Sequence, residues 1–148
     1  MKYLAGLLLL GAALSAAADE MVLIGEDLTS KFYIAPASTI RGDTDERIEF
    51  VTFRVHQQPR ALPAGARISS FMAAAYVRER WEWSTTCKPE SLETMAATYW
   101  NVHGEIVGRL TSRSRLPAAK GSPLALAEEI ACSQLTAAFT SEVPRRNH

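Results

Sequence analysis

The sequence lacks the excess of positive charge that is typical of proteins that bind nucleic acids, and it lacks the repeats that are typical of fibrous proteins. Its 16 Lys and Arg residues balance 16 Asp and Glu residues, so it lacks the broad positive field that binding to nucleic-acid phosphates requires. Apolar residues make up 47% and charged residues 22% of the 148 residues, and no internal repeat is present. This composition excludes a disordered or collagen-like chain and, at this length, predicts one globular domain.

Signatures of catalysis and of metal binding are also missing. No CxxC pair, no GxSxG around a serine and no glycine-rich phosphate loop occurs. The acidic segment 42–46, GDTDE, lacks the ligand spacing of an EF-hand and is typical of a solvated turn. Only His56, at the end of an expected strand, is a plausible general base, and no nucleophile accompanies it. We therefore expect a protein that is not an enzyme and that holds no metal ion or cofactor.

The one long apolar run lies at the N-terminus. Lys2 precedes an apolar stretch over 4–14, and Ala16 and Ala18 provide the small-x-small pattern that signal peptidases cleave. A membrane anchor is the alternative, but the run is shorter than the roughly 20 residues that cross a bilayer. Residues 1–18 are therefore predicted to be a secretory signal peptide, and no later segment is apolar enough to span a membrane.

The rest of the chain is expected to form one domain over 19–140, followed by a flexible tail over 141–148. No cysteine stands at the cleavage point, so the thiol that carries the lipid of a bacterial lipoprotein is absent. The short signal with a single lysine is of bacterial type. We expect a protein of the periplasm, or one that is secreted or displayed at the cell surface.

The exported part contains two cysteines, Cys87 and Cys132, 45 positions apart. Oxidising compartments favour disulfides, and two thiols allow only one intramolecular bridge. Two free buried thiols or a metal pair are the alternatives, and the absence of a nearby histidine leaves zinc poorly supported. We predict a structural disulfide.

Four segments have the composition or alternation of strands. Residues 47–55, RIEFVTFRV, are β-branched and aromatic, and their apolar residues change phase, which indicates a bulge or burial on both faces. Residues 70–87 alternate from Val77 onward, with Trp81, Trp83 and Cys87 on a face expected to meet the core. Residues 92–102 and 105–112 are expected to pair through a two-residue turn at His103-Gly104, and the prolines of 57–67 predict a loop.

The C-terminal segment predicts a helix. Ser122 can cap it, Pro123 suits its first turn, and Leu124 to Phe139 is rich in helix formers. Leu126, Ile130 and Ala131 share one side by helical spacing. Several antiparallel strands followed by a helix predict an α+β fold, in which the C-terminal helix packs on an antiparallel β-sheet with one disulfide.

Two groups of side chains are candidates for contact with a partner. The face opposite Trp81 and Trp83 is polar, and exposed arginine and tyrosine are enriched at interfaces. A second basic run, RLTSRSR, occupies 109–115. A solvated sheet face and a solvated loop are the alternatives. The candidate binding residues are Tyr76, Arg78, Arg80, Arg109, Arg113 and Arg115.

Four segments resemble the bacterial surface-adhesin protein E family. FYIAPASTIR (32–41) is similar to its Y-D-P-x-S-I-R segment, with Ala35 where the family commonly has Asp. Thr86-Cys87 resembles a Y-D-C strand end, and 95–109 resembles a hairpin with an aromatic pair and a glycine turn. Residues 121–132 resemble the closing P-G-S-x-x-E-x-x-x-x-x-C segment, with Ala125 in the usual Glu place.

The resemblance implies an antiparallel sheet with a helix and a Cys87–Cys132 bridge. It also implies adhesion to host matrix proteins, although the named member of the family is lipid-anchored and this chain lacks the cysteine for such an anchor. The leading hypothesis is an exported binding protein that acts by protein–protein contact without catalysis. The second hypothesis is a periplasmic accessory or inhibitor protein that contacts another envelope protein or a host enzyme.

Overall fold

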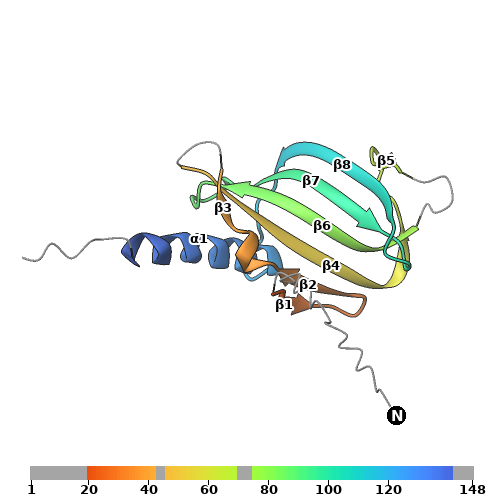
Figure 1. Ribbon diagram of the computed structural model, residues 1–148, viewed down its shortest axis with the longest axis horizontal. Helices are drawn as coiled ribbons and strands as arrows, with labels where there is room; N and C mark the ends of the chain where they lie inside the picture. The colour runs from red at the N-terminus through yellow and green to blue at the C-terminus, as the bar shows by residue number, and fades with distance from the viewer. Residues whose placement is uncertain (1–19, 43–45, 70–74, 142–148) are drawn as a thin grey trace, which may run out of the picture.

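The chain folds as an antiparallel sheet with one helix packed on it and one disulfide, as the sequence predicts (Figure 1). The computed structural model describes residues 20–42, 46–69 and 75–141, with side chains as far as residue 135. The expected signal peptide and nearly all of the expected tail therefore lie outside the described residues. Within these ranges no helix is long and apolar enough to cross a membrane.

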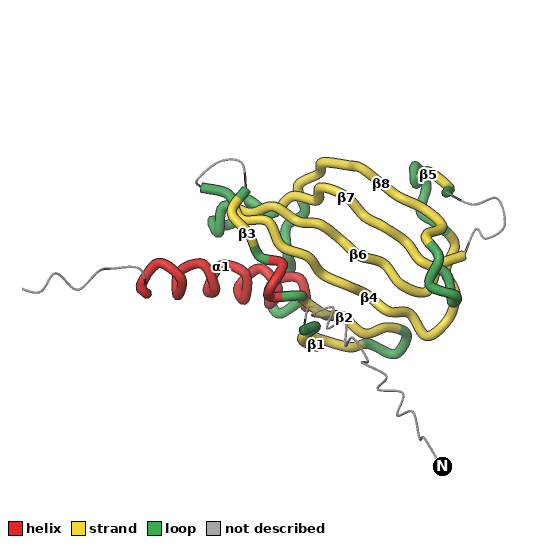
Figure 2. Tube along the Cα trace, in the orientation of Figure 1, coloured by secondary structure: helices red, strands yellow, loops and turns green. Residues whose placement is uncertain are grey.

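The sheet has eight strands, seven of them in the spatial order β1-β2-β4-β6-β7-β8-β5, while β3 pairs with β4 (Figure 2). Every pairing is antiparallel. The elements are β1 (Val22–Glu26), β2 (Ser30–Ile34), the 3₁₀ turn η1 (Pro36–Ser38), β3 (Ile40–Arg41), β4 (Ile48–Ala61), β5 (Arg67–Ile68), β6 (Ala75–Thr85), β7 (Glu93–Trp100), β8 (Ile106–Arg115) and α1 (Pro123–Ser141).

Strand β4 resolves the alternatives left open for 47–55. Its pairing with β6 runs without a shift from Ile48 to Val55, so there is no bulge in that stretch. Instead Phe50, Val51 and Thr52 are buried in succession, which means that both faces of the strand are covered there. The strand also continues to Ala61, so the prediction of a loop over 57–67 is wrong for its first half. A register shift between Val55 and Arg60 lets the chain remain in the sheet through the proline.

The β7–β8 hairpin closes through a longer turn than the expected His103-Gly104 pair. The Gly104 amide donates to the Asn101 carbonyl oxygen, and the Asn101 amide donates to the Glu105 carbonyl oxygen. Gly104 has φ +79°, the left-handed conformation that follows a type I turn in three-residue hairpin loops. The Asn101 side chain accepts from the His103 and Glu105 amides, which fixes the loop.

Helix α1 begins as predicted, at Pro123 after a Ser122 cap whose hydroxyl accepts from the Ala125 amide. Its buried side agrees with the prediction for Ala131 and for Ile130, which packs against the core, but not for Leu126. Ala127 and Ala131 are fully buried, whereas Leu126 is 41% exposed. Alanine faces the sheet because the large Trp83 and Phe50 side chains of β6 and β4 already fill the space between the two layers.

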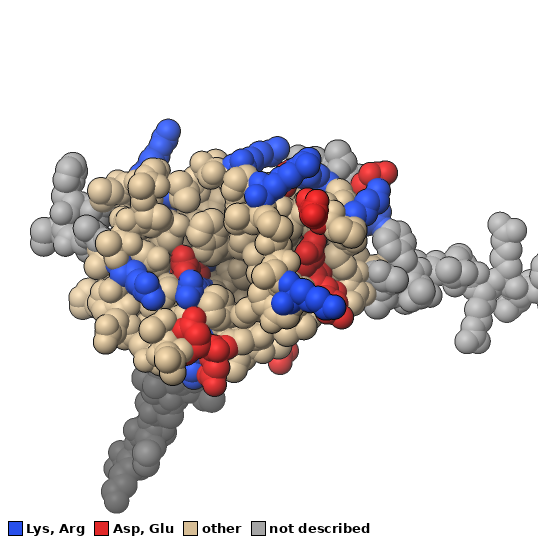
Figure 3. Space-filling view, turned by 180° about the vertical axis from the view of Figure 1, so that it is seen from behind, with Lys and Arg blue, Asp and Glu red and all other residues tan. Residues whose placement is uncertain are grey.

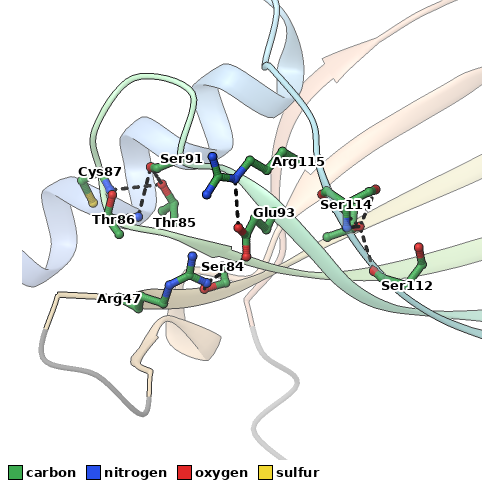
Figure 4. Close-up of polar contacts among 11 residues, drawn as sticks. Arg47, Ser84, Thr85, Thr86, Cys87, Ser91, Glu93, Ser112, Ser114 and Arg115 are labelled. Atoms are coloured by element: carbon green, nitrogen blue, oxygen red, sulfur yellow. Dashed lines mark hydrogen bonds and ion pairs between the residues drawn. The ribbon is translucent and has the colours of Figure 1, made fainter.

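Covalent and polar links hold α1 to the end of β6. Cys87, just after the strand, forms the predicted disulfide with Cys132 of the helix. The Thr85 hydroxyl contacts the Ser91 hydroxyl, and the Ser91 hydroxyl accepts from the Thr86 amide (Figure 4). The Thr85 hydroxyl also contacts the Glu128 carboxylate of α1. The helix is therefore anchored at the same strand end by a disulfide and by a hydrogen-bond network.

The core lies on one face of the sheet, here called the inner face, in two clusters. The first lies under α1 and contains Ile34, Phe50, Trp83, Leu92, Ala127 and Ala131. The second contains Tyr76, Ala97, Tyr99 and Val107, covered by Leu62 and Ala66 from the β4–β5 loop. Trp81 is half-buried and packs against both clusters. Trp83 is thus a core residue as predicted, while Trp81 lies at the boundary between the two clusters.

Candidate functional site

The opposite side of the sheet, here called the outer face, carries most of the arginines singled out from the sequence. Arg78 of β6 lies opposite Trp100 of β7, and its guanidinium carbon is 4.6 Å from the centroid of the Trp100 ring. A guanidinium group over an aromatic ring is held by a cation–π interaction and can still donate hydrogen bonds from its terminal nitrogens. Arg78 Nε is buried and has no hydrogen-bond partner within the described structure. Within the described part of the chain, Arg78 forms no ion pair.

Two of the candidates that are distant in sequence are neighbours across the sheet. Arg80 of β6 is paired with Thr98 of β7, and Thr98 is paired with Arg109 of β8. Because directly paired residues point to the same face, Arg80 and Arg109 flank Thr98 on the outer face. Adjacent strands lie about 4.8 Å apart, so the two arginine backbones are roughly 10 Å apart. The fold therefore joins the two candidate groups into one surface.

The far end of this surface is organised by one carboxylate. Glu93 of β7 accepts from Arg47 at 2.9 Å and from Arg115 of β8 at 3.3 Å (Figure 4). These two bonds lower the pKa of Glu93 below its usual value, and the same contact raises the pKa of Arg47. The Arg115 side chain is nevertheless 76% exposed, so most of its surface meets solvent.

Arg113 lies beside a register shift between β7 and β8 and is exposed, with no ion pair among the described residues. Arg80 is partly neutralised, because its guanidinium contacts the Glu82 carboxylate two residues along the strand. The run 109–115 is thus part of strand β8 and not the solvated loop considered as an alternative. We use the name basic surface for Arg78, Arg80, Arg109, Arg113 and Arg115.

Tyr76 does not belong to this surface, and the prediction that it shares a solvated face with Arg78 and Arg80 is wrong. It is 8% exposed and packs edge-on against Tyr99, with ring centroids 4.8 Å apart. The alternation fails here because β4 shifts register against β6 between Val55 and Arg60. Burial and the nearby Glu79 carboxylate raise the pKa of the Tyr76 phenol.

Tyr76 borders a buried polar pair that the sequence did not indicate. His56 Nε2 lies 2.9 Å from Glu79 Oε1, and the two side chains are only 2% and 7% exposed. The other Glu79 oxygen accepts from the Trp81 indole N–H at 3.0 Å. The imidazole also packs edge-on against the Tyr76 ring. The single histidine considered as a base is therefore buried against the Tyr76 ring and held by a carboxylate.

Polar atoms remain without a partner in this cluster. His56 Nδ1 and the Tyr99 hydroxyl are buried and form no hydrogen bond within the described structure. Burial is also the main cause that raises the pKa of Tyr99, with a further contribution from Glu79. The arrangement resembles the base–orienter half of a catalytic triad, but the imidazole is only 2% exposed. The pair joins β4 to β6 through a buried polar contact.

A cleft opens on the inner face next to this pair. Its volume is about 410 Å³, and its floor is formed by Trp81, Trp83 and Thr52. Ile24 and Phe32 of β1 and β2 form one wall, and the segment 116–124 that connects β8 to α1 forms the other. Figure 3 shows the side of the molecule opposite to the view of Figure 1, where charged side chains of both signs surround an uncharged, hollowed area.

The structure therefore places Arg78, Arg80, Arg109 and Arg115 on one side of the sheet, leaves Arg113 exposed next to them in β8 and removes Tyr76 from the group. The cleft and the His56–Glu79 pair were not predicted, since both depend on which strands pair. Comparison with protein-family models, with curated proteins and with solved structures finds no match to this chain.

Proposed function

We propose that this protein is an exported binding module that contacts an acidic protein partner through the basic surface and does not act by catalysis. The observation that carries the proposal is the stacking of Arg78 on Trp100 next to the Arg80–Thr98–Arg109 row. Arginine and tryptophan are the residue types that dominate binding energy at protein interfaces. A guanidinium group already held on a ring loses little conformational freedom when a carboxylate binds it.

The charge distribution supports a local rather than a global attraction. The chain has no net charge, so any preference for an acidic partner depends on these arginines. Among the described residues, Arg78, Arg109 and Arg113 lack a carboxylate partner of their own. Arg–carboxylate contacts are directional and frequently bidentate, which would favour an acidic protein over a diffuse anionic surface.

Export is the second part of the proposal. It is supported by the signal-peptide pattern over 1–18 and by the disulfide, since disulfides persist in oxidising compartments. The resemblance of four segments to the surface-adhesin protein E family supports a role in adhesion. The burial of His56 supports the non-catalytic part of the proposal, because a substrate would have to displace its aromatic cover.

The test is a binding titration on immobilised extracellular-matrix proteins with two charge-reversed variants, Arg78→Glu/Arg80→Glu and Arg113→Glu/Arg115→Glu. We expect each double variant to weaken binding about tenfold or more, because a like charge replaces an attraction at the interface. Wild-type binding should also weaken as salt rises above about 0.15 M, where the Debye length falls below about 8 Å.

The matched control is Lys88→Glu/Lys120→Glu, which reverses two exposed charges beside the helix. It changes the net charge by the same amount and should leave binding unchanged. Equal loss in all three variants would assign the attraction to net charge and contradict the basic surface. Binding to heparin but to no protein would replace the protein partner with a sulfated glycan. Fractionation of the producing cells tests export, and retention of an uncleaved chain in the cytoplasm would contradict it.

A further inference from the structure

The inner face carries a second binding site. We propose that the cleft between Trp81, Phe32 and segment 116–124 binds a small amphipathic molecule with an apolar body and a single anionic group, such as a medium-chain carboxylate. This site is independent of the basic surface, which lies on the other face of the sheet.

The size and the walls of the cleft suit an apolar body. Its volume of about 410 Å³ lies within the range of roughly 300–1,000 Å³ that is usual for small-molecule sites. Leu116, Pro117 and Leu124 line the cleft together with Phe32, so several of its lining side chains are apolar. A single acyl chain or one aromatic ring system would remove this surface from water.

The tryptophans present rings to the cleft and not hydrogen-bond donors. The Trp83 N–H donates to Thr52 Oγ1 at 2.8 Å, and the Trp81 N–H donates to Glu79. The two rings stack with centroids 5.7 Å apart and an interplanar angle of 28°. Because both N–H groups are satisfied within the protein, an apolar ligand can cover the rings without leaving an unpaired polar group.

The charged side chains that line the cleft determine which charge the head group of the ligand should carry. Arg54 and Glu79 are directly paired across β4 and β6, and both line the cleft. The Glu79 side chain is only 7% exposed, and each of its oxygens already accepts a hydrogen bond. The Arg54 side chain is 33% exposed. The accessible charge is therefore positive, and it calls for an anionic head group.

Arg54 is held in place, and one of its terminal nitrogens is unused. Its guanidinium carbon lies 4.5 Å from the Phe32 ring centroid, and Nε donates to the fully buried Ser30 hydroxyl at 2.9 Å. One terminal nitrogen, Nη2, contacts Asp27 Oδ2 at 3.3 Å. The other, Nη1, has no hydrogen-bond partner among the described residues. The Asp27 carboxylate itself is fixed by the Thr29 and Ser30 amides at 2.7 and 2.8 Å.

The experiment measures tryptophan fluorescence of the whole mature protein during titration with three ten-carbon probes below their micelle concentrations. Decanoate, decanol and decyltrimethylammonium share the chain and differ in the charge of the head group. We expect decanoate to quench or shift the emission at the lowest concentration and to bind about tenfold more tightly than decanol, because a charge-assisted hydrogen bond adds roughly that factor. The cationic probe should bind most weakly.

Variants locate the site. Arg54→Gln should reduce the preference for decanoate over decanol to less than about twofold, because the chain contacts remain while the charge is lost. Ala118→Trp should fill the cleft and weaken the binding of all three probes, and it leaves the Arg54 residue itself unchanged. Lys88→Gln, an exposed residue that does not line the cleft, is the control and should bind decanoate as the wild type does. Thermal melting confirms that each variant is folded, and the Ala118 variant keeps the test valid if Arg54→Gln does not fold.

Several results would overturn the proposal. Equal binding of decanoate and decanol by the wild type, or tighter binding of the cationic probe, would contradict the anionic head group. Decanoate binding that survives in the Ala118→Trp variant would place the site elsewhere. Co-sedimentation with phosphatidylglycerol vesicles in the absence of any decanoate binding would assign the affinity to a membrane surface and not to a free carboxylate.

Discussion

His56 and Glu79 form a nearly solvent-free pair, with Nε2 and Oε1 2.9 Å apart and side chains that are 2% and 7% exposed. Removal of one partner leaves the other buried without its hydrogen bond, which costs about 1–3 kcal/mol. We expect Glu79→Ala to lower the free energy of unfolding by about this amount, and His56→Ala by a comparable one.

The double variant distinguishes a coupled pair from two separate contacts. In His56→Ala/Glu79→Ala neither member of the pair is left behind, and the Trp81 N–H loses its acceptor as it does in Glu79→Ala alone. The destabilisation of the double variant should therefore fall short of the sum of the single variants by about 1–3 kcal/mol. Urea denaturation of the four proteins at neutral pH gives this difference. Strict additivity would contradict the interpretation of a coupled pair.

Trp83 and Trp81 should differ in their contributions to stability although they are stacked neighbours. Trp83 is 6% exposed and packs against Phe50 and Leu92 under α1, so Trp83→Ala should cost about 3–5 kcal/mol. Trp81 is half-buried at the cleft, so Trp81→Ala should cost less. Denaturant midpoints measure both, and an equal or larger loss for Trp81→Ala would contradict the placement of the core.

The disulfide should contribute substantially to stability. Cys87 and Cys132 are separated by 45 residues, and closing a loop of this length in the unfolded chain corresponds to about 4 kcal/mol in the chain-entropy model. We expect the Cys87→Ser/Cys132→Ser variant to unfold at a correspondingly lower denaturant concentration. Intact mass of the non-reduced protein should be two hydrogens lower than after reduction, and alkylation of two thiols without reduction would contradict the bridge.

Asp27 should make the stability of the folded protein depend on pH in the acidic range. Hydrogen bonds from Thr29 and Ser30 hold the pKa of its carboxyl well below the ordinary value of 3.8. A carboxyl group whose pKa is lower in the folded than in the unfolded state stabilises the folded protein. This stabilisation is complete at a pH above the unfolded-state pKa, and it is lost as the pH falls toward the folded-state pKa. The melting temperature of the wild type should therefore decline below about pH 4, the unfolded value for aspartate.

The comparison with Asp27→Asn isolates this contribution. Asparagine keeps the shape of the turn but not the charge, so the two melting temperatures should differ at pH 7 and converge toward pH 2. A difference that stays constant across this pH range would assign the effect of the substitution to shape and not to the carboxylate.

Local sequence patterns predicted much of the fold. The alternation after Val77 placed Trp83 in the core, and the Ser122-Pro123 pair placed the start of α1. The buried side of α1 was harder to predict. Ala127 and Ala131 are buried because their small side chains allow the helix to pack closely on the sheet, and the spacing of hydrophobic residues does not indicate where such a close contact occurs. Leu126, the more apolar residue, lies outward for the same reason.

The candidate site depended on long-range pairing and was predicted only in part. Arg80 and Arg109 were both identified, but only the β6–β7–β8 order shows that they belong to one surface. Tyr76 was assigned to the wrong face because a register shift in the neighbouring strand is not encoded in its own segment. His56 and Glu79 are 23 positions apart, and nothing local to either residue indicates that they meet.

The last segment of the chain covers the first strands of the sheet. Helix α1 contacts β1, β2 and β4, so Ile34 and Phe50 have no cover until residues beyond 122 have been synthesised. A chain that emerges from its N-terminus therefore exposes its apolar inner face throughout synthesis, and long-range contacts of this kind slow folding. Because α1 follows every strand in the sequence, the contacts that bury Ile34 and Phe50 form only after residues beyond 122 are available.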